Sequence, residues 1–225
     1  MGFIITIIVL ILCIWLEKKL RIIECIFARY IQGLTPLHYA MRRGNPQRIR
    51  LLIEAGANVN ARIKYGTTPL HVAPWSTPEK IRILVEAGAD INAQTDHSSN
   101  SFSHGLTPLH MVAGYGTPET INTLIEIGAD IEAKANDGGT PLHIAAGRSK
   151  PENICSLAEA GADINARDNY NSSPLHWAAK LGKPDSIKAL IKAGGDIEAK
   201  SFDGLPLYWA AQANKPENIR ALKNI

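Results

Sequence analysis

The sequence predicts an all-α solenoid built from six tandem copies of a helix-turn-helix unit. Twelve of its thirteen prolines fall at two positions of a repeating frame. Blocks of the type Thr-Pro-Leu-His start at residues 35, 68, 107, 140, 173 and 205, so their spacings are 33, 39, 33, 33 and 32. A glycine follows the second half of each of the first five units. Proline just inside a helix start and glycine just past a helix end are the expected pairing, so each unit contains two helices.

The Thr-Pro-Leu-His block predicts the start of the first helix. Proline suits the first helical position because its missing N–H would have had no partner there, and the preceding Thr or Ser supplies a capping oxygen. In the sixth block Leu205 and Tyr208 replace the Thr and the His, so we expect that unit to be the least stable. Pro74 is the one proline outside the frame, and it predicts that the first helix of the second unit ends early or kinks.

The second proline of each unit predicts the start of the second helix. These prolines are Pro46, Pro78, Pro118, Pro151, Pro184 and Pro216. We expect Asn45, Thr77 and Thr117 to be N-caps, and the acidic residue after most of these prolines to favour the helix dipole. The helices are predicted to end at C′ glycines, namely Gly56, Gly88, Gly128, Gly161 and Gly194. A short extended piece and a protruding turn, here called a finger, lead to the next block.

This unit resembles the ankyrin repeat in its Thr-Pro-Leu-His block, its Gly-Ala-Asp or Gly-Ala-Asn close and its period. The resemblance covers Gly33 to Ile225. It gives repeats at residues 33–65, 66–104, 105–138, 139–171 and 172–203, and an incomplete repeat at 204–225. The resemblance implies a stack of helical hairpins with β-turn fingers, and a protein that binds other proteins.

Composition narrows the function classes. A chain that is 45% hydrophobic and 20% charged is typical of globular proteins. The net charge is only +3, and no basic run alternates with aromatic residues, which argues against nucleic-acid binding. Cys13, Cys25 and Cys155 lie too far apart for a disulfide framework or a metal-ligand pattern. No catalytic set stands outside the frame, so we expect no enzyme activity, no cofactor and no small-molecule substrate.

The recurring histidines first suggest a metal ladder, with one imidazole in each of five repeats. They are His38, His71, His110, His143 and His176. Helices of neighbouring repeats pack at roughly 10 Å, whereas two nitrogens that share a zinc ion lie within about 4 Å of one another. Neighbouring histidines therefore cannot share a metal. The resemblance implies instead that each histidine ties the backbone of neighbouring turns, a structural role.

The second repeat carries seven extra residues, since Gly88 to Thr107 spans 19 positions where Gly56 to Thr68 spans 12. The extra stretch lies within 95–104 and is polar, with Phe102 as its one large apolar residue. We interpret it as a lengthened finger that carries one anchor for a partner; the alternative is a neutral loop insertion, because long loops cost little closure entropy. The two histidines of this stretch are too few for a metal site.

Residues that stacking does not require are candidates for binding a partner. Aromatic residues at fingertips, and basic or aromatic residues at the exposed ends of the first helices, are typical of interfaces. The candidate set is Arg42, Arg43, Tyr65, Trp75, Phe102, Tyr115, Arg148, Tyr170, Lys180 and Phe202. They predict a non-catalytic scaffold that binds a protein through its concave face and fingers. The alternative is a regulatory or inhibitory subunit of a separately encoded enzyme.

The N-terminal segment, residues 1–19, is hydrophobic. Residues 3–16 are apolar apart from Thr6, and Lys18 and Lys19 follow. Counted from Met1 the stretch is sixteen residues, which make a helix of ~24 Å against a hydrocarbon core of ~30 Å, so the segment is short for a span. We predict a membrane anchor with the repeats in the cytoplasm. A hydrophobic cap or a misassigned start is the alternative, which would leave the protein cytoplasmic. Residues 20–32 are predicted to be a half-repeat that covers repeat one.

Overall fold

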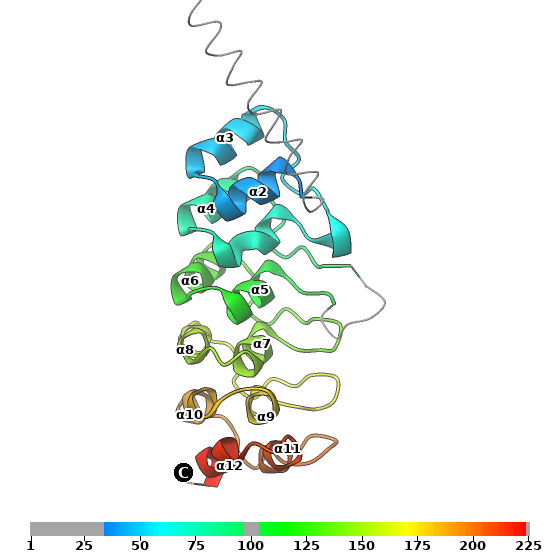
Figure 1. The fold of residues 1–225 in the computed structure, drawn as a ribbon, viewed down its shortest axis with the longest axis vertical. Coiled ribbons are helices and arrows are strands. Elements are labelled where there is room, and N and C mark those ends of the chain that lie inside the picture. The colour runs from blue at the N-terminus through cyan, green and yellow to red at the C-terminus, as the bar shows by residue number, and fades with distance from the viewer. Residues whose placement is uncertain (1–33, 97–103, 224–225) are drawn as a thin grey trace, which may run out of the picture.

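A computed structural model describes residues 34–96 and 104–223, and it shows a stack of helical hairpins in two rows, with the fingers projecting beyond one row (Figure 1). The finger-side row contains α2 (Pro36–Arg43), η2 (Pro69–Trp75), α5 (Pro108–Tyr115), α7 (Pro141–Gly147), α9 (Pro174–Lys180) and α11 (Pro206–Gln212). The outer row contains α3 (Pro46–Glu54), α4 (Pro78–Glu86), α6 (Pro118–Glu126), α8 (Pro151–Glu159), α10 (Pro184–Lys192) and α12 (Pro216–Lys223). A single 3-10 turn, η1 (Lys64–Gly66), forms the first finger. The fold is an all-α solenoid, as predicted.

Prolines and glycines set the helix ends. Every helix of the two rows begins with its predicted proline. The side chain of Asn45 accepts a hydrogen bond from the Arg48 N–H at 2.9 Å, and Thr117 caps α6 in the same way. The prediction for Thr77 is wrong, because α4 has no side-chain N-cap hydrogen bond; proline at the first position already leaves one N–H fewer to satisfy. The five C′ glycines all have φ between 82° and 102°, the left-handed conformation that glycine adopts without strain.

The helix that contains Pro74 does not end early, but its winding differs from that of the other helices in its row. Helix η2 continues to Trp75, but it is wound as a 3-10 helix, with the Ser76 N–H bonded to the Ala73 carbonyl at 2.9 Å. In an α-helix the proline ring would clash with the carbonyl of Leu70, four residues earlier. A 3-10 helix bonds residues three apart, so that carbonyl need not lie against the ring. The tighter winding leaves Trp75 at the exposed end of the helix.

The core runs the length of the stack as a series of equivalent side chains. The leucines of the first five blocks are at most 1% exposed, and they are Leu37, Leu70, Leu109, Leu142 and Leu175. In the outer row Ile81, Ile121, Ile154 and Ile187 are fully buried, each in contact with neighbouring repeats through the same core. Each helix contacts its counterparts in the repeats on either side. A repeat therefore buries its apolar surface only because it has neighbours.

A polar side chain from each of several outer helices caps a finger-side helix of the preceding repeat. The Asn153 amide donates to the Ala113 carbonyl at 2.9 Å, and to two further carbonyls at the end of α5. The Asn218 amide does the same for Ala179 at the end of α9, at 2.9 Å. The Lys80 ammonium donates to the last turn of α2, and burial lowers its pKa. These contacts satisfy carbonyls that a helix C-terminus leaves without partners.

We expect Asn153→Ala to lower the free energy of unfolding by about 1 to 3 kcal/mol, because the Ala113 and Gly116 carbonyls lose the amide that donates to them, while the Val112 carbonyl still accepts from the Gly116 N–H. Ser186 provides the matched control. It occupies the same frame position in the next repeat, it is fully buried, and among the described residues its hydroxyl has no hydrogen-bond partner. Ser186→Ala should therefore be nearly neutral. Urea denaturation of both variants tests the comparison, and equal losses would contradict the capping role.

Neighbouring fingers are joined by backbone hydrogen bonds of one kind. An N–H of each later finger donates to a carbonyl of the finger before it, at 2.9 to 3.2 Å. The pairs are Asp96 to Tyr65, Asn136 to His104, Asn169 to Asp137, and Phe202 to Tyr170. The fingers are thus linked to one another as well as to their own helices.

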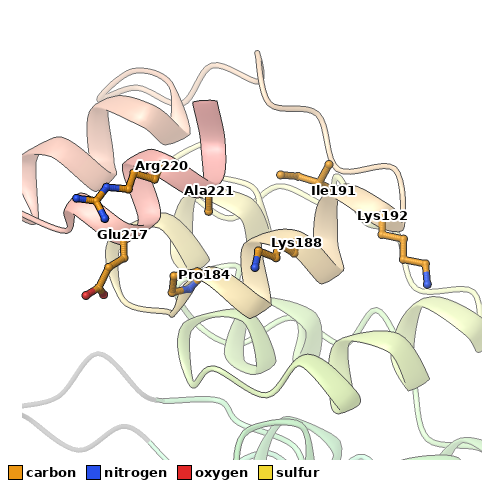
Figure 2. A pocket seen from close by; sticks show the side chains of 7 residues that line it. All are labelled: Pro184, Lys188, Ile191, Lys192, Glu217, Arg220 and Ala221. Atoms are coloured by element: carbon orange, nitrogen blue, oxygen red, sulfur yellow. The ribbon is translucent and has the colours of Figure 1, made fainter. Parts of the chain in front are cut away.

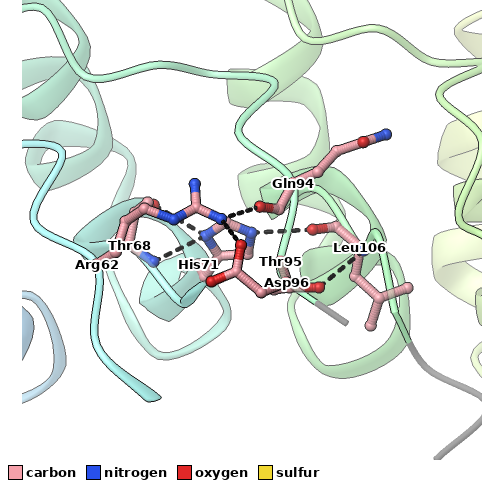
Figure 3. Close-up of polar contacts among 7 residues, drawn as sticks. All are labelled: Arg62, Thr68, His71, Gln94, Thr95, Asp96 and Leu106. Atoms are coloured by element: carbon pink, nitrogen blue, oxygen red, sulfur yellow. Dashed lines mark hydrogen bonds and ion pairs between the residues drawn. The ribbon is translucent and has the colours of Figure 1, made fainter. Parts of the chain in front are cut away.

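The stem of the long second finger keeps the geometry of the shorter fingers (Figure 3). The Thr95 N–H donates to the Leu106 carbonyl at 3.0 Å, as Ala135 donates to Gly139 at 2.9 Å in the next finger. Arg62 of the first repeat bonds the Asp96 carboxylate at 2.6 Å across the stem. The seven extra residues, 97–103, follow Asp96 and precede His104. They include Phe102, and they lie outside the described residues.

Deleting residues 97–103 should leave the free energy of unfolding unchanged to within about 0.5 kcal/mol. The deletion joins Asp96 to His104 in the register that Asn136 and Asp137 have in the third finger, and every stem hydrogen bond involves residues that remain. Thermal and urea denaturation test this expectation. A loss above about 2 kcal/mol would show that the extra residues contribute to the stack.

The predicted N-terminal elements fall outside the described residues. Residues 3–16 and 20–32 both precede the first described residue, Leu34. Among the helices between residues 34 and 223 that the structure describes, none combines the length and the apolar character needed to cross a membrane. The anchor and the half-repeat stay predictions.

Candidate functional site

Each block histidine bonds the backbone residue immediately before the next block, and so joins its own helix pair to the start of the following repeat. In the fourth repeat the His143 Nδ1 accepts from the Thr140 backbone N–H at 3.1 Å, while its Nε2 donates to the Ser172 carbonyl at 3.0 Å. The other acceptors of histidine Nε2 lie 3.0 to 3.1 Å away: Thr67 for His38, Leu106 for His71, Gly139 for His110 and Gly204 for His176. Each ring is therefore the neutral Nε2–H tautomer, with both nitrogens engaged by the protein.

Burial holds these imidazoles neutral. It lowers the pKa of His71, His110 and His143 to about 4, against an ordinary value of 6.5, and it also lowers the pKa of His38 and His176. A proton on Nδ1 would face a backbone N–H that already points at that atom. Within the part of the chain that the structure describes, no three His, Cys, Asp or Glu side chains gather as a metal site would require.

The free energy of unfolding should fall as the pH falls from about 6.5 to 4. The unfolded chain takes up protons on His71, His110 and His143 near pH 6.5, whereas the folded chain does so only near pH 4, so each of these three histidines contributes a slope of up to ~1.4 kcal/mol per pH unit in that window. His143→Ala should cost about 1 to 3 kcal/mol at pH 7 and reduce the slope. Urea denaturation as a function of pH tests both; an unchanged slope, or loss of stoichiometric bound metal, would contradict the structural role.

Four candidate side chains form a continuous row across the first four repeats, and we call this row the ring stripe: Arg42, Trp75, Tyr115 and Arg148. The Trp75 and Tyr115 rings are stacked, with centroids 6.2 Å apart and planes at 27°. The Arg42 guanidinium lies 5.7 Å from the Trp75 centroid, and the Arg148 guanidinium lies 4.8 Å from the Tyr115 centroid. Trp75 is 49% exposed and Tyr115 is 41% exposed. Two clamped aromatic rings thus face solvent.

Local sequence explains why the row is continuous. All four residues lie at or just after the C-terminal ends of finger-side helices, four or five positions after the block histidine. Gly114 precedes Tyr115, and a Cβ atom there would lie 2.8 Å from Ile144 and 3.4 Å from the Arg148 side chain. Glycine therefore allows the Arg148 stem to lie against α5.

The ends of the finger-side helices are basic. Between the first and second proline of the six repeats there is no Asp or Glu. The same segments contain seven cationic residues: Arg42, Arg43, Arg148, Lys150, Lys180, Lys183 and Lys215. Two finger carboxylates, by contrast, are engaged internally: Asp96 pairs with Arg62, and Asp168 accepts from the Trp177 indole at 2.9 Å. Within residues 34–96 and 104–223 neither Arg42 nor Arg148 forms an ion pair.

The remaining candidates lie apart from the ring stripe. Lys180 covers the ring of Trp209 at 4.6 Å, and Arg43 is exposed beside Arg42. The fingertip residues Tyr65, Tyr170 and Phe202 are 52%, 55% and 76% exposed on their own tips, and the last two belong to neighbouring fingers.

Among the described residues, three exposed large hydrophobic ones were missed by the sequence analysis: Tyr39, Leu181 and Tyr208. Leu181 is 56% exposed and lies five positions after its block histidine, where Arg148 lies in the preceding repeat. A Cβ atom at Gly147 would be 3.5 Å from the Leu181 side chain, so Leu181 lies against α7 and prolongs the ring stripe. Its frame position was the available signal, but leucine at a helix end is usually read as core.

A groove of about 420 Å³ lies on the outer row between α10 and α12 (Figure 2). Lys188, Lys192, Arg220 and Glu217 are among the side chains that line it. The charged ends of Lys192 and Arg220 point away from each other in Figure 2. The Lys188 ammonium is paired with the Asp185 carboxylate at 3.7 Å. The groove therefore has no converging set of polar groups of the kind that orients a small ligand.

Comparison with known families agrees with the fold. A family model described as ankyrin repeats in three copies matches residues 10–95 and 93–168, and a model of the single ankyrin repeat matches residues 170–202. These matches cover most of the sequence, so the chain belongs to the ankyrin-repeat family. The first match starts at residue 10, within the N-terminal apolar segment. Ankyrin repeats generally mediate protein–protein interaction.

Individual relatives match only short stretches. The chain is 54% identical over 39 residues to the ankyrin repeat protein OPG189 of monkeypox virus, and 53% identical over 45 residues to that of vaccinia virus strain Copenhagen. It is 51% identical over 41 residues to human Rabankyrin-5. The aligned parts are 17%, 20% and 18% of this chain, but only 7%, 7% and 4% of the relatives. The chain thus spans a small fraction of each relative.

Proposed function

We propose that this protein is a non-catalytic interaction scaffold that binds a protein partner through the ring stripe and the adjoining fingers. The observation that carries this proposal is the pair of stacked, half-exposed rings, Trp75 and Tyr115, held between two arginines. The stack of repeats does not need them, because the positions four and five residues after the block histidine hold unrelated residue types in other repeats, from glycine to arginine and leucine. Aromatic and arginine side chains are the residues that contribute most to protein interfaces.

The geometry also favours binding without a large ordering cost. Each ring is restrained by the other ring and by a guanidinium, so little side-chain freedom remains to be lost when a partner covers it. The fingers are linked to one another by backbone hydrogen bonds. Attachment to a membrane through residues 3–16 would place this surface near a bilayer, but partner binding does not depend on it.

The double variant Trp75→Ala, Tyr115→Ala should lose the partner while the array stays folded. The double variant, the wild type and Arg82→Ala are each used for affinity capture from the native cell extract. Quantitative mass spectrometry then compares the captured proteins. Arg82 is the matched control because it is similarly exposed, in the outer row, paired with Glu126. A protein captured by the wild type and by Arg82→Ala, but at least tenfold reduced with the double variant, is the expected result. Equal capture by all three proteins contradicts the proposal.

A further inference from the structure

We infer that the ring stripe binds an acidic, extended segment of the partner protein, in which an apolar side chain lies between two carboxylates. This inference rests on the proposed function, and it adds the chemistry and the spacing that the partner must present.

Charge is the first argument. The whole chain has only three more cationic than acidic side chains. Between the first and second prolines of the repeats, however, there are seven cationic side chains and no acidic ones. In the described residues Arg42 and Arg148 have ring contacts but no ion pair, so their N–H groups are not committed to an internal carboxylate. Arginine donates in a fork that matches a carboxylate, and complementary charge speeds association and rejects wrong partners.

Spacing is the second argument. The Arg42 guanidinium lies 5.7 Å from the Trp75 centroid, the Trp75 and Tyr115 centroids are 6.2 Å apart, and the Tyr115 centroid lies 4.8 Å from the Arg148 guanidinium. The two guanidinium groups are therefore at most about 17 Å apart. Side chains on one face of an extended chain recur every ~6.6 Å, which places positions i and i+4 about 13 Å apart. Two carboxylates at i and i+4 therefore reach both arginines. The side chain at i+2 then lies over Trp75 and Tyr115.

A helical ligand fits less well, because residues i and i+4 of a helix are only ~6 Å apart along its axis. Single-stranded nucleic acid also carries negative charge, but its bases bind by stacking on free aromatic faces. Here each ring is stacked against the other ring and also has a guanidinium over it. The ring edges remain for contact with an aliphatic side chain.

The test measures binding of fluorescein-labelled nine-residue peptides to the full chain by anisotropy. The acidic peptide has two glutamates four positions apart with a leucine midway. Matched peptides replace both glutamates with glutamine, or place the two glutamates side by side. We expect the first peptide to bind roughly tenfold more tightly than either control, with an affinity that falls as salt is added.

Protein variants locate the site. Arg42→Gln and Arg148→Gln should each weaken the acidic peptide roughly fivefold, while Arg82→Gln on the outer row has no effect. Arg148→Glu should recover binding of a peptide in which one glutamate is replaced by lysine, a gain that misfolding cannot produce. Thermal denaturation confirms that each variant is folded.

Equal binding of the glutamate and glutamine peptides, no measurable binding of any peptide, or tighter binding of an oligothymidylate would each overturn the inference. These failures are distinguishable from failure of the proposed function. If the Trp75 and Tyr115 double variant loses its partner but the acidic peptide does not bind, the surface binds a partner of another chemistry. If partner capture is unaffected by that variant, the proposed function itself is wrong.

Discussion

A single ankyrin repeat has an apolar face on both sides of its helix pair, and it can bury those faces only against adjacent repeats. Leu142 and Ile154 of the fourth repeat are buried because the third and fifth repeats lie on either side. The polar contacts follow the same rule. The His143 bond to Ser172, the Asn153 bonds to α5 and the bonds between fingers all cross from one repeat to another. Stability is therefore a property of the interfaces between repeats.

The same constraint shows where the sequence is free to vary. Seven residues can be added after Asp96 because the stem bond between Thr95 and Leu106, and the bonds to both neighbouring fingers, lie before or after the insertion point. Pro74 is accommodated by a change of helix type within η2, which keeps Leu70 and His71 buried in their places. The insertion after Asp96 and the proline at position 74 are therefore tolerated because neither removes a contact between repeats.

Binding residues occupy positions that stacking leaves open. The end of each finger-side helix is such a position, and in this chain it holds Arg42, Trp75, Tyr115, Arg148 and Leu181 in successive repeats. No acidic residue lies between the first and second prolines of the repeats, and the finger carboxylates of Asp96 and Asp168 are engaged internally. The repeat architecture thus brings one residue per repeat, four or five positions after the block histidine, into a row with a definite charge and spacing.

The sequence alone determined the period, the helix starts at proline, the C′ glycines and the exposed character of most candidate residues, because each depends on a few neighbouring residues. It predicted neither the 3-10 winding at Pro74 nor the absence of a side-chain cap at Thr77. In each case the backbone or side chain has two local conformations that are close in energy. Only the tertiary structure showed that Trp75 stacks on Tyr115, that Asn153 caps α5, and that Leu181 prolongs the row. Those contacts join residues some 30 to 40 positions apart, and their geometry is fixed by how the repeats pack together rather than by any local pattern.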